Sequence, residues 1–255
     1  MYHDEYAATA AGAAAKVRLL KKNPLGYFLM SALAGAYIGF GILLSFTVGG
    51  TLGPIPMNKI AMGLSFGIAL SLVIIAGAEL FTGNAMVLYN GWRQKTVTLT
   101  DVIGLWVVCY LGNLVGAVIL SFIFYGAAGT AGGVGQALAG AAATKMSLSP
   151  QVLFLRGILC NVLVCLAVWC GFRCKSDSGK LIMTFWCLYA FFTCGFEHSV
   201  ANMTVLTLGL LNPAGMAVSL AGYGHNLLWV TLGNLVGAIL FLAIPYGVAA
   251  KKIAE

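Results

Sequence analysis

One stretch of seven residues occurs twice in the sequence, and this repeat constrains the fold more than any other feature. The residues Leu-Gly-Asn-Leu-Val-Gly-Ala occupy positions 111–117 and again positions 232–238, each time within a long apolar run. Three apolar segments precede the end of the first half, and three more fill the second. Because an odd number of membrane spans per repeat makes the halves cross a bilayer in opposite directions, this pattern predicts the inverted architecture of transporters and channels.

Composition indicates that these segments lie in a membrane. Hydrophobic residues make up 60% of the 255 residues and charged residues only 8%, whereas soluble domains carry about 25% charged residues. A spanning helix needs roughly 20 mostly apolar residues. We therefore predict an all-α membrane protein with a single domain over residues 1–255. Six spans in an inverted 3+3 repeat are expected at about 25–48, 58–90, 100–126, 150–173, 181–211 and 222–250.

The basic residues predict the orientation of these spans. With a cytoplasmic N-terminus, only Lys59, Lys145 and Arg156 lie outside. An excess of Lys and Arg is typical of cytoplasmic loops, so we expect both termini to be cytoplasmic, in the cell membrane. Residues 2–22 are expected to form an amphipathic cytoplasmic helix. The net charge of +7 then reflects topology and anionic lipid headgroups, and it requires no nucleic acid partner. The inner basic residues are Lys16, Arg18, Lys21, Lys22, Arg93, Lys95, Arg173, Lys175, Lys180, Lys251 and Lys252.

Spans two and five are unusually long, and each has a polar interruption. The interruptions are residues 77–84 and 195–202, and their glutamates, Glu79 and Glu197, occupy matching places in the two halves. Interrupted spans at corresponding positions are a good sequence indication of a transport site. Irregular backbone inside a bilayer needs protein or a water-lined cavity around it. Elsewhere, the Gly/Ala-rich residues 127–149 are expected to form an outer stretch.

Three ionisable side chains lie at the interruptions, where insertion of each costs roughly 2.5–3.5 kcal/mol at mid-membrane. Such residues are functional candidates by default. We expect Glu79 and Glu197 mainly to fix the irregular backbone by accepting its N–H groups, with a direct function as the alternative. His198 is the intramembrane histidine at a break. Imidazole switches between hydrogen-bond donor and acceptor near neutral pH, so we expect His198 to be functional.

Each interruption also points the N-terminus of a half-helix at the middle of the membrane. Unpaired N–H groups and the helix dipole favour a small anion there. Lys145 and Arg156, on an otherwise charge-poor outer side, are positioned to concentrate that anion at the mouth, with plain surface charge as the alternative. Five of the seven cysteines fall inside predicted helices, and no Cys-x-x-Cys pair occurs. We therefore expect small packing residues rather than metal ligands, and no cofactor.

Three long motifs resemble the signatures of the formate/nitrite transporter family. They occur in order as Ile-Ile-Ala-Gly-Ala-Glu-Leu-Phe-Thr-Gly at 74–83, Gly-Ile-Leu-Cys-Asn-Val-Leu-Val-Cys-Leu-Ala at 157–167 and Phe-Glu-His-Ser-Val-Ala-Asn-Met at 196–203. Together with six predicted spans, the resemblance covers the whole chain. Residues 23–26 and 224–229 are most similar to the nitrite branch of the family.

The resemblance implies an aquaporin-like protomer with its own pore, assembled into a homopentamer. By motif position, His198 would be the central histidine, with Thr82 and Asn161 as its polar neighbours. Lys145 would match the family's lysine of the outer vestibule. Two apolar constrictions around the histidine would be formed by Phe66, Leu70, Leu80, Phe81, Val164 and Phe191.

We expect passive, pH-sensitive movement of a small monovalent weak-acid anion, nitrite first and formate or hydrosulfide second. A bare anion cannot cross apolar constrictions cheaply, so His198 would compensate its charge or share a proton with it. A rival is a membrane enzyme or redox subunit, but converging metal ligands and haem histidines are missing from the sequence. A structural role would explain the pairs Gly112/Gly116 and Gly233/Gly237 as helix packing, and would leave the matched interruptions unexplained.

Overall fold

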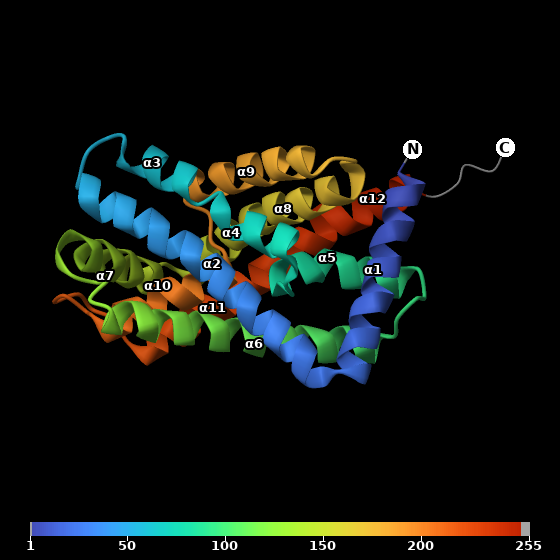
Figure 1. Cartoon of the computed structure of the whole chain (residues 1–255), viewed down its shortest axis with the longest axis horizontal. Helices are drawn as coiled ribbons and strands as arrows, with labels where there is room; N and C mark the ends of the chain where they lie inside the picture. Colours follow the sequence, from blue (N-terminus) through green and yellow to red (C-terminus); the bar gives the residue numbers. More distant parts are fainter. Residues whose placement is uncertain (1, 251–255) are drawn as a thin grey trace.

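The computed structural model describes residues 2–250, and every regular element within them is helical. The long helices form a bundle, with α1 across one end and α7 at the other (Figure 1). Lys251 and Lys252, counted above among the inner basic residues, lie outside the described residues. The elements are α1 (His3–Lys22), α2 (Pro24–Leu52), α3 (Asn58–Ser65), α4 (Ile68–Leu72), the π-helix η1 (Val73–Gly77), α5 (Phe81–Arg93), α6 (Leu99–Gly126), α7 (Gly132–Ser147), α8 (Pro150–Arg173), α9 (Asp177–Cys194), α10 (Ser199–Leu211), α11 (Leu220–Ala238), the π-helix η2 (Ile239–Ala243) and α12 (Ile244–Ala249).

The apolar helical segments lie where the spans were predicted, and the two interrupted segments are broken where expected. Five helical segments are long and apolar enough to cross a membrane, or six if the bent pair of α9 and α10 is one span. The predicted span 58–90 divides into the run Asn58–Gly77 and the separate helix α5. The predicted span 181–211 divides into α9 and α10, which meet at 52°. Gly77 and Gly195 stand at the two breaks with φ of +80° and +74°, a conformation that glycine adopts readily.

The outer stretch at 127–149 contains a helix that the sequence analysis did not predict. This helix, α7, is rich in alanine, and alanine has the highest helix propensity of all residues, which offsets the glycines. It packs against α2 and α10 and buries Leu138, Ala139 and Ala142. Lys145 therefore projects from the last turn of a packed helix and not from a loop.

The repeated seven residues bring equivalent helices close together in each half. A Cβ atom added to Gly116 of α6 would collide with the backbone of Ala32 in α2. One added to Gly237 of α11 would collide with the backbone of Ile158 in α8. The pairs α2–α6 and α8–α11 join the first and third spans of each half. Small residues permit this close approach of helices, and the matching contacts agree with the predicted inverted repeat.

The two halves also touch each other at equivalent positions. Tyr110 and Thr231 are the residues directly before the two copies of the repeat, and their hydroxyl oxygens lie 2.9 Å apart. Equivalent positions contact each other where a two-fold relation brings the same patch of both halves together. The pseudo-two-fold axis of the inverted repeat therefore passes close to this hydrogen bond.

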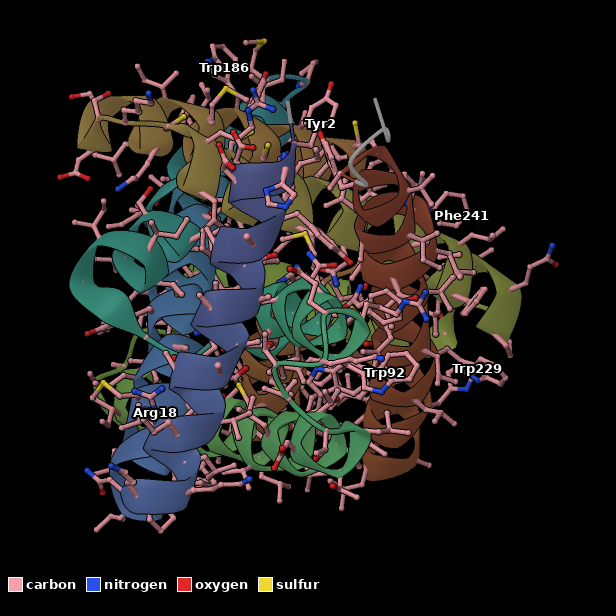
Figure 2. The ribbon with its side chains drawn as sticks, turned by 90° about the vertical axis from the view of Figure 1, so that its right-hand side faces the viewer. Tyr2, Arg18, Trp92, Trp186, Trp229 and Phe241 are labelled. Atoms are coloured by element: carbon pink, nitrogen blue, oxygen red, sulfur yellow. The ribbon has the colours of Figure 1, made fainter. Side chains whose placement is uncertain are left out.

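The sides of the bundle are strongly apolar. Leucine, isoleucine, valine and phenylalanine side chains of α2, α6, α8 and α11 are exposed there. In the end-on view, Trp186 and Phe241 project away from the helices (Figure 2), and both rings are more than half exposed. In water so large an exposed apolar surface would promote aggregation. In a membrane it is covered by hydrocarbon chains or by neighbouring apolar helices. The exterior is that of a multi-pass membrane protein.

Candidate pore and its two helix breaks

The first break, residues 78–80, is hydrogen-bonded to the N-terminal helix. Both oxygens of the Glu79 carboxylate accept hydrogen bonds from Lys16 Nζ of α1, each at 2.7 Å. Asn84 Nδ2, in the first turns of α5, donates to Oε2 at 2.9 Å, and the Tyr27 hydroxyl of α2 donates to the same oxygen at 3.2 Å. Glu79 therefore connects the break to α1, α2 and α5.

The second break, residues 195–198, is built in the same way with a different helix. Lys145 Nζ of α7 donates to Glu197 Oε2 at 2.8 Å, and Asn202 Nδ2 of α10 donates to the same oxygen at 2.6 Å. The prediction that Glu79 and Glu197 accept backbone N–H groups is wrong. Within the described residues, both carboxylates are occupied by lysine and asparagine side chains.

The backbone of the first break is held instead by an asparagine of the repeat. Asn113 Oδ1 accepts the N–H of Phe81, the first residue of α5, at 3.0 Å. Its Nδ2 donates to the carbonyl oxygens of Glu79 at 2.9 Å and Ser31 at 2.7 Å. One side chain thus pairs the N–H of Phe81 and the carbonyl oxygen of Glu79, which have no hydrogen-bond partner in a helix. Inside a membrane such groups need a partner from the protein.

Asn234 makes the corresponding three hydrogen bonds in the second half. Its Oδ1 accepts the N–H of Ser199, the first residue of α10, at 2.9 Å. Its Nδ2 donates to the carbonyl oxygens of Glu197 at 2.9 Å and Gly157 at 2.8 Å. The sequence analysis used the repeat but missed the asparagine at its third position. A polar residue at one position of two otherwise apolar copies was the available signal.

His198 and Thr82 join the two half-helices at their N-termini. His198 is the N-cap of α10, and its Nδ1 accepts the N–H of Ala201 at 3.0 Å, so Nδ1 carries no proton. The proton of the neutral imidazole then lies on Nε2, which is 2.9 Å from Thr82 Oγ1 in the first turn of α5. The two side chains are buried. A second proton on this imidazole has to displace the N-cap hydrogen bond.

Asn161, the third predicted polar residue, is buried and does not bond to His198. Its Nδ2 donates to the carbonyl oxygen of Thr82 at 3.2 Å and to that of Asn234 at 2.7 Å. Its Oδ1 has no partner among the described residues. Because it links the start of α5 to α11, Asn161 positions the backbone of Thr82.

Two cavities approach these residues from opposite ends of the bundle. The α1-side cavity, of about 460 Å³, is lined by Lys16, Glu79 and Leu80 among others. The α7-side cavity, of about 430 Å³, is lined by Lys145 and His198 among others. Between them lies an apolar cluster, here called the neck, with no room for a water-sized molecule. The neck consists of Ile38, Phe66, Leu70, Leu80, Val164, Leu188, Phe191 and His198.

The cavities identify the side of three predicted constriction residues, Leu70, Leu80 and Phe191, which the sequence left open. Leu70 and Leu80 also line the α1-side cavity, and Phe191 and His198 also line the α7-side cavity. The predicted residues Phe66 and Val164 line the neck as well. Ile38 and Leu188 were not predicted, because they lie in uniformly apolar helices that give no distinguishing signal.

Phe81 is the one predicted constriction residue that lies elsewhere. Its ring packs edge-on against Tyr110 and Trp106 of α6, with centroid distances of 4.9 and 6.5 Å. It lines an apolar groove on the side of the bundle. Leu80 is the extended N-cap of α5, and successive side chains of an extended backbone point to opposite sides, so Leu80 facing the neck turns Phe81 away from it.

The cysteines support the breaks by packing and weak hydrogen bonds. Cys109 Sγ donates to the carbonyl oxygen of Glu79 at 3.2 Å, and Cys165 Sγ to that of Thr82 at 3.4 Å. All seven cysteines are free thiols. Among residues 2–250, no three His, Cys, Asp or Glu side chains are arranged to hold a metal ion.

Two inverted halves, two matched breaks and a dry neck between two cavities define a membrane transport protein whose path is closed in this structure. Comparison with known proteins identifies its family. The sequence model described as "Formate/nitrite transporter" matches residues 3–248. The chain therefore belongs to the formate/nitrite transporter family, as the three motifs predicted.

Individual relatives agree with this assignment. The chain is 43% identical to "Nitrite transporter NirC" of Salmonella typhimurium, over 99% of this chain and 93% of the relative. A solved structure described as "FNT family ion channel" matches with a TM-score of 0.92 and 42% identity, over 97% of this chain and 99% of the other. Another, "Pentameric formate channel with formate bound", matches with a TM-score of 0.79 and 29% identity, over 91% and 99%.

Proposed function

We propose that this protein is a passive, pH-sensitive channel for small monovalent weak-acid anions. Nitrite is the first substrate, and formate and hydrosulfide are the alternatives for the same path. The observation that carries the proposal is the hydrogen bond between His198 Nε2 and Thr82 Oγ1, where two half-helix N-termini meet at the neck. The printed names of the relatives, a nitrite transporter and a formate channel, support the substrate class.

The hydrogen-bond directions suggest how an anion crosses the neck. Because Nε2–H donates to Thr82 Oγ1, the hydroxyl proton of Thr82 is available to donate to an anion. A bare charge in apolar surroundings is very costly, so the anion crosses the neck with a proton. His198 Nδ1 is occupied by the Ala201 N–H, which favours the neutral imidazole. The proton therefore travels with the anion, and flux rises as the pH falls.

The charge distribution supports an orientation for the pore. The α1-side cavity faces the cytoplasm, both termini are cytoplasmic, and the α7-side cavity faces outward in the cell membrane. Basic residues are concentrated in α1 and in the connections next to it, in line with the positive-inside rule. Residues 1–255 form one membrane domain, and α1, its cytoplasmic helix, supplies Lys16 to the first break.

The channel assembles as a homopentamer in which each protomer has its own pore. The solved relative described as pentameric supports this assembly. The exposed apolar side chains of α2, α6 and α11 supply surface for contacts between copies as well as with lipid. Native mass spectrometry of the purified protein is expected to give five copies per particle, and a monomer at all detergent concentrations would contradict the assembly.

Flux measurements in liposomes test the function. We expect nitrite to cross fastest, formate and hydrosulfide next and lactate slowest, with every rate higher at acidic than at neutral pH. Protein-free liposomes give the background of the free acids, which cross lipid unaided. A chain that adds nothing to this background for any of the four anions is not a channel for them.

A further inference from the structure

A further cavity opens beside α1 and does not belong to the pore. It has a volume of about 420 Å³ and lies among α1, α5, η2 and α12. This is the end of the bundle that α1 crosses, where α5 and α12 end (Figure 1). The ends of membrane-spanning helices reach the layer of lipid headgroups. The cavity has a polar wall of Tyr6, Tyr89 and Arg93 and an apolar wall of Ala243, Ile244, Gly247 and Val248.

The polar wall contains hydrogen-bond donors that the described part of the chain does not use. Within residues 2–250, the Arg93 guanidinium forms no hydrogen bond or ion pair, and the hydroxyls of Tyr6 and Tyr89 form no hydrogen bond. Glu5, the acidic residue next to Tyr6, lies 3.8 Å from Arg173 instead. Arg93 stands in the last turn of α5, where the helix dipole favours a cation. Its donors therefore remain available to a ligand.

Hydrogen bonds between α1 and the end of α5 fix the polar wall. Gln94 Nε2, directly after α5, donates to the carbonyl oxygen of Tyr6 at 2.7 Å. Asn90 Nδ2 donates to Thr9 Oγ1 at 3.1 Å. Burial raises the pKa of Tyr6, and the nearby Arg93 guanidinium opposes this shift. Because a tyrosine with a raised pKa keeps its proton, the Tyr6 hydroxyl can donate to an anion beside Arg93.

The apolar wall continues onto the membrane-facing side of the bundle. Val248, Ile244 and Phe241 follow one another at about one turn, and all three side chains are exposed. Phe241 projects away from the helices in the end-on view (Figure 2). At Gly247 the two walls meet, because an added Cβ atom would lie 2.8 Å from the Tyr6 hydroxyl oxygen. A molecule with an anionic group at one end and a hydrocarbon chain at the other matches both walls.

We propose that this cavity binds an anionic glycerophospholipid of the leaflet at the α1 end. The headgroup phosphate lies between Arg93, Tyr6 and Tyr89, and one acyl chain follows the exposed face of η2 and α12. The planar fork of a guanidinium matches two phosphate oxygens, and basic pockets beside spanning helices bind anionic headgroups. The ammonium group of a zwitterionic lipid finds no carboxylate among the described residues that line the cavity. Phosphatidylglycerol should therefore bind more tightly than phosphatidylethanolamine or phosphatidylcholine.

Native mass spectrometry of the full-length protein in neutral detergent tests the site. The three lipids, with the same acyl chains, are titrated into wild type and variants. We expect R93Q to lower the apparent affinity for phosphatidylglycerol about tenfold or more, because a charge-assisted hydrogen bond is lost. R93K keeps the charge without the fork and should lower it about threefold, as should the double variant Y6F/Y89F. R18Q removes an arginine of α1 that lies away from Trp92, the neighbour of Arg93 (Figure 2), and should match wild type.

The comparison of R93Q with R18Q separates this site from lipid bound elsewhere on the protein. Inorganic phosphate in large excess should not displace the lipid, because it has no acyl chain. Displacement by phosphate would identify a site for free phosphate and overturn the proposal. Equal affinity of wild type and R93Q for phosphatidylglycerol, or equal affinity of wild type for all three lipids, would also overturn it. R93Q should unfold at the wild-type midpoint in lipid-free detergent, which excludes misfolding. No transport is measured, so the outcome is independent of the proposed function.

Discussion

The two helix breaks share a scaffold and differ in the residue that faces the neck. Each has a glycine with positive φ, a glutamate paired with a lysine and an asparagine from the repeat. The residues before the half-helices have nearly the same backbone, with φ, ψ of −102°, 123° at Leu80 and −108°, 116° at His198. Only His198 caps its helix with a side chain. The repeat thus supplies the geometry, and one residue supplies the chemistry.

The two lysines that pair with the glutamates come from helices that are not equivalent in the two halves. Lys16 comes from α1 and Lys145 from α7, and both helices lie outside the segments that correspond between the two halves. They lie at opposite ends of the bundle (Figure 1). The two glutamates are therefore paired by lysines from unrelated helices. A carboxylate buried at a break needs a cationic partner, but this partner does not have to come from the repeat.

The largest effect should come from the repeat asparagines. Asn113→Leu and Asn234→Leu each leave one backbone N–H without its partner, at about 1–3 kcal/mol, and remove one hydrogen bond from each of two carbonyl oxygens, at about 1–1.5 kcal/mol per bond. We expect each variant to lose about 3–6 kcal/mol of stability, seen as a large drop in the midpoint of thermal unfolding in detergent. Leu111→Ala and Leu232→Ala change exposed neighbours and should have little effect. A large loss in only one half would contradict the equivalence of the breaks.

A smaller effect should separate the two lysines. Lys16→Met and Lys145→Met leave a glutamate without its cation, and removing one partner of a buried pair costs up to about 3–5 kcal/mol. Lys145→Met should cost more, because the side chain of Glu197 is 3% exposed and that of Glu79 is 13% exposed. The same unfolding assay measures this. Adding Glu197→Gln to Lys145→Met should restore much of the stability, and failure of this rescue would argue against the pairing.

Thr82 should affect transport, with a smaller effect on stability than the repeat asparagines. Thr82→Val is nearly isosteric and removes the hydroxyl that bonds to His198, worth about 1–2 kcal/mol if the anion uses it. Anion flux in liposomes should fall roughly 5- to 30-fold, and the unfolding midpoint should fall less than in Asn113→Leu, because only one buried donor, His198 Nε2–H, loses its partner. Wild-type flux in this variant would remove Thr82 from the path.

The sequence was most informative where a physical constraint acts on it directly. A repeat, apolar length and polar interruptions predicted the spans and both breaks, because the membrane penalises any unpaired polar group. It was silent on pairs that form only in three dimensions. Lys16 and Glu79 are 63 residues apart, and neither sequence neighbourhood indicates the other. The direction of Phe81 depends on the residue at which α5 begins, which the sequence does not mark. Helix α7 depends on an alanine content that its glycines obscured.

The most direct test compares two substitutions of His198. Asparagine is a good N-cap, and its amide supplies both an acceptor for the Ala201 N–H and a donor for Thr82. Phenylalanine keeps the ring volume and supplies neither. In liposomes, His198→Asn should retain a flux that rises as the pH falls. In His198→Phe the flux should decrease by about tenfold or more. Unchanged flux and pH profile in His198→Phe would contradict the central role of this residue, and a flat pH profile in His198→Asn would show that the imidazole itself is titrated.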